Sequence, residues 1–493
     1  MKLPLAGNPT GILRIALSVI LGAIWLQAQP RRGENGGGSG GARMPTLAFV
    51  TDVPAHRYDL ILGRPTRDSV TLSVLAYREL RATIVYGEAA DKLTASVPAR
   101  TFARDQPEEI VLRGLKSNTR YFYQFRPESG DEAAVSAVYS FSTARARGAA
   151  FTFTVQSDSH LDFGTDPDVY SKSLANALAA GPDFHFDLGD TFMTDKRNDF
   201  HDALPQYLAQ RYYLGLIGRG APVFLALGNH DGEEIKRRGN GADAMAIWSN
   251  AMRKKYFLNP VPDGFYSGNP VPHPSAGMLQ DYYAFEWGDA LFVVLDPYWF
   301  STSGGRDADN WGRTLGRPQY DWLKRTLETS PAPYKFLFLH NLVGGESREG
   351  RGGAEASQFF EWGGHELDGR DTFAAHRPGW GIPIHDLLVR SGVSIVFHGH
   401  DHFYDRQERD GVVYQLVPQP GHARADDVRS AEEYGYKSGV IQGASGILRV
   451  SVAPPGATVE YVRAYPANAE RDGRKTGTVT HRYVVSPSPQ AAP

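Results

Sequence analysis

The sequence contains no cysteine among its 493 residues. Disulfides, thiolate zinc sites and cysteine nucleophiles are therefore excluded. Any metal ion would have to be held by histidine, carboxylate, asparagine or backbone oxygen atoms. A strong excess of charge is also missing, because the formal net charge is -3. The sequence therefore gives no electrostatic reason to expect a nucleic acid or an anionic membrane as a partner.

The N-terminal apolar run is short for a membrane span. It covers residues 15–28, IALSVILGAIWLQA, whereas a spanning helix needs about 20 apolar residues. Lys2 and Arg14 precede the run, a charge pattern typical of a secretory signal peptide. We therefore expect residues 1–28 to be a cleaved signal peptide and the mature protein to be periplasmic or extracellular, without membrane insertion. An uncleaved segment that tethers the chain is the alternative.

A Gly-rich stretch and then a β-rich region follow. Residues 29–45 have the composition of a flexible linker. Between residues 46 and 146, short alternating runs such as SVTLSVL predict the strands of a small sandwich. The spacing G-L-x-x-x-T-x-Y-x-Y, from Gly114 to Tyr123, resembles the corner of a fibronectin type III-like domain.

From Phe151 onward, apolar strands alternate with helical segments. The runs FTFTVQ, DFHFDL, PVFLAL, LFVVL, KFLFL and VSIVF predict buried strands. Asp166 and Pro167 are typical of the N-cap and first position of a helix. The alternation predicts an α/β domain over residues 150–465, with helices covering the sheets. Residues 466–493 are expected to form a C-terminal strand and a disordered tail.

Polar residues follow five of these strands at the same end. They stand in the segments SDSH, GD, GNHD, H and HGHDH. In α/β sheets, ligands bind beyond the carboxyl ends of strands, so we expect these side chains to meet. The residues are Asp158, His160, Asp190, Asn229, His230, Asp231, His340, His400 and His402.

This set of residue types points to a pair of metal ions. Histidine and carboxylate together suit Zn, Mn and Fe. Because alternate residues of an extended segment point to the same side, His400 and His402 could each reach one of two adjacent metals. Asp190 is the candidate bridge, since Gly189 before it lets the backbone approach closely. Two such ions stabilise an in-line displacement at phosphorus and supply hydroxide near neutral pH.

The order D-x-H, G-D, G-N-H-[DE], H, G-H-x-H is similar to that of the calcineurin-like metallophosphoesterases. The resemblance covers roughly residues 150–465, and the β-rich region in front resembles the N-terminal domain of purple acid phosphatases. It implies a two-sheet α/β/β/α sandwich preceded by a small all-β sandwich. The implied ligands of one metal are Asp158, His160 and His402, and those of the other are Asn229, His340 and His400, with Asp190 bridging.

The resemblance also implies roles for two further residues. His230 would not bind metal but would orient the phosphate or protonate the leaving oxygen, and Asp231 would set the tautomer of His230. Purple acid phosphatases place a metal-binding tyrosine where this chain has Met193, and they lack a counterpart of His160. We therefore expect a colourless centre of two divalent or di/trivalent ions, with Fe, Mn and Zn all open.

The function implied is that of an exported two-metal phosphoesterase acting on small phosphorylated substrates. Hydroxide activated by the metals would attack phosphorus directly, with phosphomonoesters as the expected substrates. A phosphodiesterase of nucleotides or lipid headgroups is the alternative. A non-catalytic, metal-stabilised binding protein is a distant one. His422 could reach a substrate phosphate, and residues 343–381 could form either a lid or a surface loop.

Overall fold

The computed structural model describes residues 48–128, 135–302, 309–345 and 350–488. The expected signal peptide (residues 1–28) and linker (residues 29–45) lie outside this part of the chain, as do residues 489–493 of the expected tail. None of the helices in the described ranges has the length and apolar character of a membrane span.

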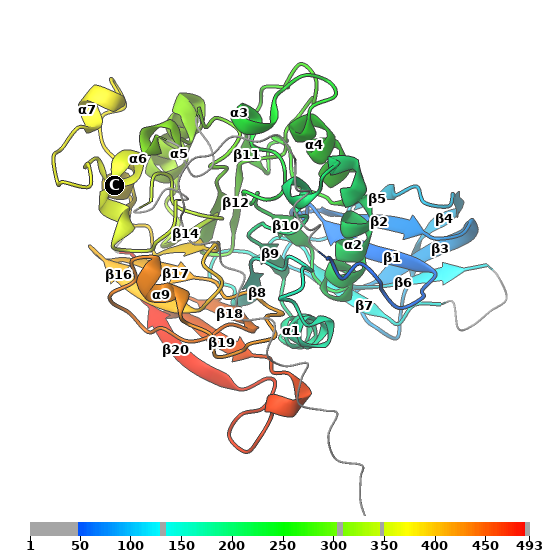
Figure 1. Cartoon of the computed structure of the whole chain (residues 1–493). Helices are drawn as coiled ribbons and strands as arrows, with labels where there is room; N and C mark the ends of the chain where they lie inside the picture. Colours follow the sequence, from blue (N-terminus) through cyan, green and yellow to red (C-terminus); the bar gives the residue numbers. More distant parts are fainter. Residues whose placement is uncertain (1–47, 129–134, 303–308, 346–349, 489–493) are drawn as a thin grey trace, which may run out of the picture. The chain divides into compact units, whose positions relative to one another are not determined.

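The β-rich region is a sandwich of two antiparallel sheets (Figure 1). One sheet has the strand order β1-β2-β5, and the other has the order β4-β3-β6-β7. Alternate residues, among them Leu72, Tyr123 and Phe125, point into one buried core. The strands are β1 (Tyr58–Gly63), β2 (Ser69–Ala76), β3 (Leu80–Gly87), β4 (Ala95–Phe102), β5 (Glu108–Arg113), β6 (Arg120–Pro127) and β7 (Tyr139–Ser142).

Two larger mixed sheets follow. The six-stranded sheet has the order β10-β9-β8-β18-β19-β20, in which β8, β9 and β10 are parallel. Its strands are β8 (Phe151–Gln156), β9 (Phe184–Asp187), β10 (Val223–Leu225), β18 (Gly446–Ala453), β19 (Gly456–Arg463) and β20 (Val479–Val485). The seven-stranded sheet has the order β11-β12-β13-β14-β15-β17-β16, in which β13, β14, β15 and β17 are parallel. Its strands are β11 (Ser267–Gly268), β12 (Tyr283–Trp287), β13 (Ala290–Val294), β14 (Tyr334–Leu339), β15 (Ile395–His398), β16 (Asp405–Arg409) and β17 (Val412–Leu416).

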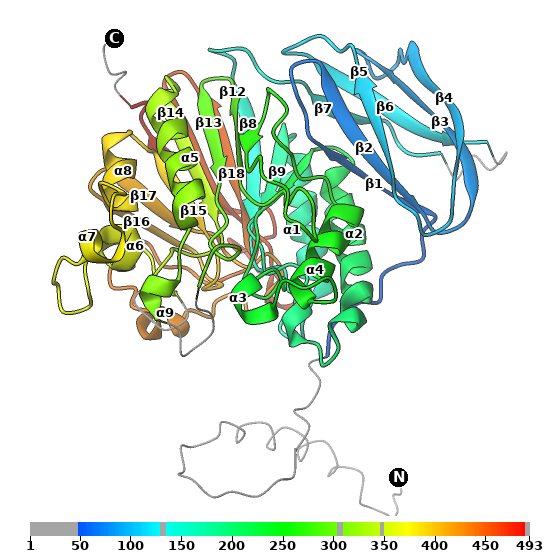
Figure 2. The same ribbon diagram turned by 90° about the horizontal axis from the view of Figure 1, so that it is seen from above.

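Helices cover the outer faces of both large sheets (Figure 2). Leu174 and Leu214 pack α1 and α2 on the six-stranded sheet, while Leu323 and Leu388 pack α5 and α8 on the seven-stranded sheet. The layers are therefore helix, sheet, sheet, helix, which confirms the expected α/β/β/α sandwich. The helices are α1 (Pro167–Ala179), α2 (Leu204–Gly218), α3 (Ile235–Arg238), α4 (Met245–Tyr256), α5 (Gly316–Thr329), α6 (Phe360–Gly363), α7 (Phe373–His376), α8 (Ile384–Arg390) and α9 (Ser430–Glu433). Short 3-10 helices cover Thr194–Lys196, Phe200–Ala203, Asn310–Gly312, Ala356–Gln358 and Ala467–Ala469.

Phenylalanine side chains fill the space between the two large sheets. Phe153 and Phe186 come from the six-stranded sheet, and Phe338 and Phe397 come from the seven-stranded sheet. The ring centroids of Phe186 and Phe338 are 4.0 Å apart, and those of Phe338 and Phe397 are 5.0 Å apart. Buried aromatic contacts of this kind contribute both area and preferred geometry. They hold the two sheets face to face, so that strands of both end at a common edge.

The sandwich shares a core with the α/β part. Ile61 and Leu75 of the sandwich belong to the same buried cluster as Ile217 of α2. Beside them, the buried Arg211 of α2 donates to Ser73 at 3.1 Å (main-chain O) and 3.0 Å (Oγ). Removing the sandwich would leave this apolar surface and this guanidinium exposed, so the sandwich supports the fold of the α/β part.

The first turn of α1 has the expected cap. Asp166 Oδ1 accepts the N–H groups of Asp168 at 2.9 Å and Val169 at 3.3 Å, and Pro167 begins the helix. The Asp166 N–H itself donates to the carbonyl oxygen of Gly421 at 2.8 Å. The start of α1 is thereby tied to a loop from the far end of the chain.

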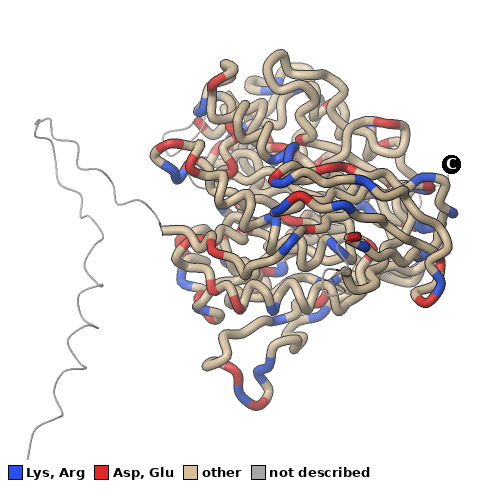
Figure 3. The backbone as a smooth tube through the Cα atoms, turned by 90° about the vertical axis from the view of Figure 1, so that its right-hand side faces the viewer, with Lys and Arg blue, Asp and Glu red and all other residues tan. Residues whose placement is uncertain are grey.

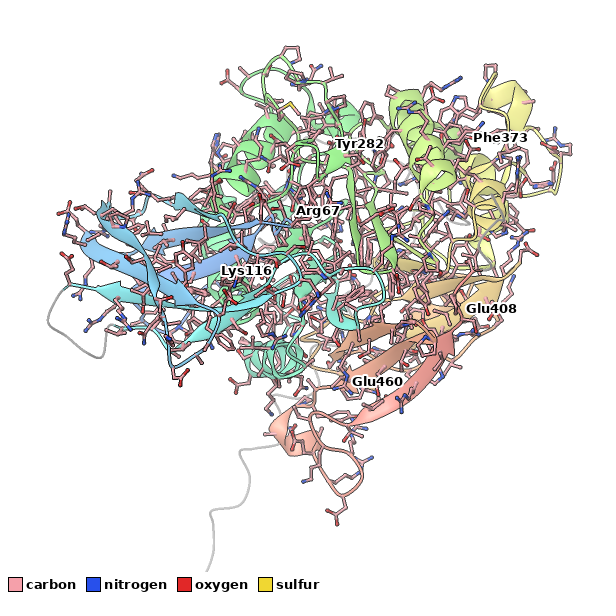
Figure 4. All side chains as sticks on the ribbon, turned by 180° about the vertical axis from the view of Figure 1, so that it is seen from behind. Arg67, Lys116, Tyr282, Phe373, Glu408 and Glu460 are labelled. Carbon is pink, nitrogen blue, oxygen red and sulfur yellow. The ribbon has the colours of Figure 1, made fainter. Side chains whose placement is uncertain are left out.

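The described residues of the segment 343–381 pack on the protein. Phe360, Trp362, Phe373 and Trp380 join the core on the outer face of the seven-stranded sheet, and Figure 4 labels Phe373 at α7. The ring of Trp311 stacks on His376 with centroids 4.2 Å apart. This part of the segment is therefore a packed surface layer.

The buried carboxylate of Asp405 is expected to make the stability of the protein depend on pH. Its carboxylate is buried, and neither oxygen has a hydrogen-bond partner among the described residues. Burial together with the nearby Glu355 raises the pKa of Asp405 to about 7. Since the pKa of Asp405 is higher in the folded state than in the unfolded chain, this residue does not destabilise the fold below about pH 4, and it destabilises the fold progressively as the pH rises to about 7. Asp405→Asn should therefore raise Tm at pH 8 by several degrees and raise it less at pH 5.

Calorimetry at both pH values measures this difference. The exposed Asp91→Asn serves as the control and should shift Tm little at either pH. An equal effect of Asp405→Asn at pH 5 and pH 8 would contradict the assignment.

Candidate metal centre

Five strands deliver the predicted residues to one edge of the paired sheets. Parallel pairing aligns the carboxyl ends of β8, β9 and β10 in one sheet and of β14 and β15 in the other. The residues that follow these strands are Asp158 and His160 after β8, Asp190 after β9, Asn229 after β10, His340 after β14, and His400 and His402 after β15. The structure thus brings together residues spread over almost 250 positions of sequence.

Asp158, His160 and His402 form a first group of possible metal ligands. One ligand atom from each lies within 4.8 Å of the others. Asp158 Oδ1 is 3.6 Å from His160 Nε2 and 3.4 Å from His402 Nε2. These separations are long for hydrogen bonds, but they suit atoms that share one ion.

Asp190, His340 and His400 form a second group. Asp190 Oδ2 is 3.3 Å from His340 Nε2, which is itself 3.2 Å from His400 Nδ1. The same Asp190 oxygen is 3.7 Å from His160 Nε2, an atom of the first group. Asp190 therefore lies between the two groups, where a bridging carboxylate belongs.

Unpaired buried atoms test whether the site suits metal ions. Asp158 Oδ1, His160 Nε2 and Asn229 Oδ1 are all buried, and none has a hydrogen-bond partner within the described residues. Leaving such atoms without a partner is costly, so a ligand is expected to satisfy them. The remaining donors are imidazole and carboxylate, which match metals of the Zn, Mn and Fe class. The residues therefore fit a pair of such ions.

Outer contacts orient two of the histidines. His340 Nδ1 lies 2.9 Å from the carbonyl oxygen of Leu188, and donation to this oxygen leaves Nε2 free to bind metal. His160 Nδ1 faces Asp162 Oδ2 at 3.5 Å, while Asp162 Oδ1 accepts the Gly164 N–H at 2.9 Å. Each contact selects the tautomer in which Nε2 can accept a metal.

The backbone of the centre is strained. Asp158, Asp190, His400 and His402 have φ values of 60°, 54°, 78° and 69°, in the left-handed region that L-residues seldom adopt. Residues in such conformations cluster at functional sites. Gly189 allows the backbone of its loop to meet that of Gly228, because a Cβ atom on Gly189 would collide with the Gly228 main chain.

The charges of the site stabilise one another. Burial would raise the pKa of Asp158, but positive charge on His340 and His402 holds it well below its usual range. Burial would lower the pKa of His340, but Asp190 and Asp158 raise it to about 9. Without metal, His340 therefore carries a proton that offsets the carboxylates, and a bound cation would displace that proton.

The segment around Arg351 contacts the loop that carries two of the possible ligands. Arg351 Nη1 donates to the carbonyl oxygen of His400 at 2.7 Å and to Asp401 Oδ1 at 2.8 Å. Asp401 Oδ2 also accepts from the Tyr436 hydroxyl at 2.8 Å. Part of the segment 343–381 therefore steadies the backbone at His400.

Comparison with known proteins agrees with this geometry. The family model for calcineurin-like phosphoesterases matches residues 151–404, about half of the chain. The chain belongs to this family. A search of curated proteins finds no match.

Solved structures show the same fold at low sequence identity. The structure of PhoD is 16% identical with a TM-score of 0.60, and the match covers 87% of this chain and 90% of that chain. Purple acid phosphatase PPD1 from yellow lupin (Lupinus luteus) seeds is 15% identical with a TM-score of 0.57, and the match covers 90% of this chain and 75% of that chain. These likenesses confirm the expected α/β fold with an all-β region in front.

In this phosphoesterase, His230 pairs with a carboxylate that the sequence did not indicate. His230 Nδ1 lies 3.0 Å from Asp195 Oδ1 and 3.1 Å from Oδ2, and Arg238 Nη2 donates to Asp195 Oδ2 at 2.6 Å. His230 Nε2 is 3.9 Å from Asp190 Oδ2, beside the metal groups. Asp195 and Arg238 therefore orient the ring of His230.

The prediction that Asp231 sets the tautomer of His230 is wrong. Asp231 accepts four main-chain N–H groups, those of Asp190 at 3.1 Å, Thr191 at 2.8 Å, Phe192 at 2.8 Å and Gly228 at 2.8 Å. Burial and the charge of Asp190 raise the pKa of Asp231 to about 7. Asp231 thus clamps together the loops that follow β9 and β10, and it does not contact the imidazole.

The seven predicted metal residues all lie at this centre, and their roles as ligands stay a prediction. The sequence did not indicate that Asp162, Asp195 and Arg238 belong to the site. Asp195 follows the candidate bridge Asp190 by five residues, in the short 3-10 helix Thr194–Lys196, and no spacing rule singles it out. A search for acids near the G-D motif would have found it.

We expect Asp195→Asn to lower kcat for p-nitrophenyl phosphate about 100-fold, because an amide can donate to Nδ1 and select the wrong tautomer of His230. Metal content should stay unchanged, since Asp195 lies outside both ligand groups. Steady-state kinetics and elemental analysis measure the two quantities. Asp199→Asn is the matched control, because Asp199 contacts the exposed His201 at 2.7 Å in the same way. An unchanged kcat for Asp195→Asn would contradict the role of Asp195 in orienting His230.

We expect Asp231→Ala to lower the free energy of unfolding by about 3 kcal/mol or more, because it leaves four buried N–H groups without a hydrogen-bond acceptor. Denaturant unfolding of the metal-free protein measures this loss without the contribution of bound ions. Asp166→Ala is the control, since it removes an N-cap that accepts two N–H groups and should cost about 1 kcal/mol. A loss for Asp231→Ala no larger than that of the control would argue against the clamp.

Proposed function

We propose that the chain hydrolyses phosphate esters with two metal ions and without a covalent intermediate, and that phosphomonoesters are its main substrates. The main support for this proposal is the position of Asp190. Its Oδ2 atom lies 3.7 Å from His160 Nε2 and 3.3 Å from His340 Nε2, so one carboxylate serves both ligand groups. A shared carboxylate is suited to hold two ions close enough to act on one phosphoryl group.

Asp158, His160 and His402 would hold one ion, and Asn229, His340 and His400 would hold the other, with Asp190 between them. When bound, the ions supply a hydroxide nucleophile near neutral pH and neutralise charge on the phosphoryl oxygens. Fe, Mn and Zn all suit this donor set.

His230 performs the proton chemistry in this proposal. Asp195 accepts from Nδ1, and Nε2 faces the site, 3.1 Å from Asn229 Nδ2 in this structure. When the ring carries a second proton on Nε2, it can donate to a phosphoryl oxygen or give that proton to the leaving oxygen. Arg238 compensates the charge of Asp195, so that the Asp195 carboxylate stays in place beside the ring. Tight positioning of this kind accounts for much of the rate that such groups contribute.

Substrate class and location form the finer part of the proposal. The fold likeness to a purple acid phosphatase supports phosphomonoesters over the diesters of nucleotides or lipid headgroups. Acidic and basic residues are interspersed along the chain (Figure 3), which favours small substrates over a polyanion such as nucleic acid. The apolar and basic pattern of residues 1–28 supports export.

Metal analysis paired with two substrates tests the function. We expect the purified chain to hold about two metal ions and to cleave p-nitrophenyl phosphate faster than its bis-ester. Asp190→Ala should lose metal and activity together, whereas His230→Ala should keep metal and lose about 100-fold or more in kcat. Asp199→Asn serves as a surface control, as above.

Three outcomes would change the conclusion. A faster rate with the bis-ester would make the chain a phosphodiesterase. Bound metal without turnover of either ester would support a metal-stabilised binding protein. Absence of bound metal after dialysis against Zn, Mn and Fe salts would refute the centre.

A further inference from the structure

The loop that follows β17 lies against the first ligand group. Gln419 N donates to the carbonyl oxygen of His402 at 3.4 Å, and Gln419 Nε2 donates to Thr165 Oγ1 at 3.3 Å. Two further bonds tie the loop to the segment after His160, because Ala423 N donates to Gly164 O at 3.0 Å and Asp166 N donates to Gly421 O at 2.8 Å. The loop is therefore held between the two segments that carry His160 and His402.

His422 occupies the middle of this loop, and its backbone is held on two sides. Residues Thr165 and His422 form an isolated β-bridge, and the Ser445 hydroxyl donates to the carbonyl oxygen of His422. A residue tied down in this way presents its side chain in a defined direction. The anchoring spans more than 250 residues of sequence, so the position of His422 depends on the complete fold.

The ring of His422 uses one nitrogen for the loop and leaves the other available. Nδ1 lies 3.1 Å from Arg424 N and 3.0 Å from Arg424 O. Nε2 has no hydrogen bond within the described residues, and the side chain is only half-buried. Nδ1 can either accept the Arg424 N–H or donate to the Arg424 carbonyl oxygen. In the first case, or when the ring carries both protons, Nε2 holds a proton and can donate.

The backbone of His422 lies beside the segments that carry the first ligand group, because its bridge partner Thr165 follows His160 by five residues and Gln419 of the same loop bonds to His402. Burial lowers the pKa of His422, and the neighbouring His402 lowers it further. His422 does not belong to either ligand group. It lies outside both groups, in a loop that is bonded to the segments carrying His160 and His402.

We propose that His422 binds the phosphoryl group of the substrate, with Nε2 donating a hydrogen bond to a phosphoryl oxygen beside His402. The inference rests on the proposed phosphoesterase function and extends it to a second phosphate-binding histidine, from the side of the centre where the His160 and His402 loops meet. Because His422 touches the phosphoryl group before and after reaction, it contributes to binding more than to rate.

Two amide variants separate this role from a purely structural one. In His422→Asn, the amide falls near the position of Nδ1 and can keep the contact with Arg424, but nothing replaces Nε2. In His422→Gln, the longer side chain brings the amide N–H near the position of Nε2 and gives up the contact with Arg424. A substrate-binding role predicts that Gln restores affinity and Asn does not, while a loop-holding role predicts the reverse.

The experiment measures binding of inorganic phosphate to the metal-loaded protein by calorimetry, together with KM and kcat for p-nitrophenyl phosphate. We expect His422→Ala and His422→Asn to weaken phosphate binding and raise KM about tenfold, the size of one hydrogen bond to a charged oxygen, with kcat changed less than threefold. His422→Gln should recover at least part of the loss. Metal content and Tm should match those of the unmodified chain.

His273→Ala is the matched control. His273 Nδ1 accepts the N–H two residues ahead, from Ser275 at 3.2 Å, so it makes the same local turn contact in the loop between β11 and β12. This variant should leave phosphate affinity and KM unchanged. If it weakens phosphate binding as much as His422→Ala does, the effect belongs to the turn and not to the site.

The readouts also distinguish this inference from the proposed function. Phosphate affinity that depends on His422 in a protein that cleaves no ester would uphold the contact and refute the esterase. Full activity and full phosphate affinity in His422→Ala would refute the contact and leave the esterase standing. Rescue by Asn rather than by Gln would overturn the contact in favour of a loop-holding role.

Discussion

The metal centre depends on the packing of two sheets face to face through phenylalanine side chains. Phe153 and Phe186 meet Phe338 and Phe397 between the sheets, and these rings leave no room for one sheet to slide over the other. Asp158 and Asp190 follow strands of one sheet, whereas His340 and His400 follow strands of the other. A shift of one residue in that packing would separate the carboxylates from the imidazoles by a full strand step, about 3.3 Å. The apolar core therefore sets the separation of the possible ligands.

Carboxylates that face away from the centre stabilise the strained backbone at the strand ends. Asp231 takes four N–H groups from two loops, and Asp187 accepts from Gly189 N at 3.1 Å and Thr191 Oγ1 at 2.8 Å. These bonds offset the cost of the left-handed backbone at Asp190. Buried acids with raised pKa values are thus part of the scaffold, and a raised pKa alone does not mark a catalytic group here.

The positions of several ligand residues could be inferred from sequence because each depends only on the strand directly before it. An apolar run predicts a buried strand, and the residue after it must lie at the strand end, so the positions of Asp158, Asp190 and His340 followed from the sequence. The partner of His230 did not follow. Sequence adjacency suggested Asp231, but the chain turns at these residues, so His230 faces the centre while Asp231 faces the loops after β9 and β10. Asp195 reaches the imidazole from a short 3-10 helix whose position depends on tertiary packing, which no periodicity of the sequence records.

The surroundings of the centre are harder to infer from sequence than its ligands. Metal residues must converge on a point, which restricts their types and spacing along five strands. A residue that contacts the substrate needs only to lie at the rim, and the chain can supply it from any loop that passes there. The loop at His422 passes there because the segments at Thr165 and His402 bind its backbone. Main-chain hydrogen bonds of this kind do not restrict which residue types occur in the loop. Residues at the rim of such a centre can therefore vary while the metal ligands stay the same.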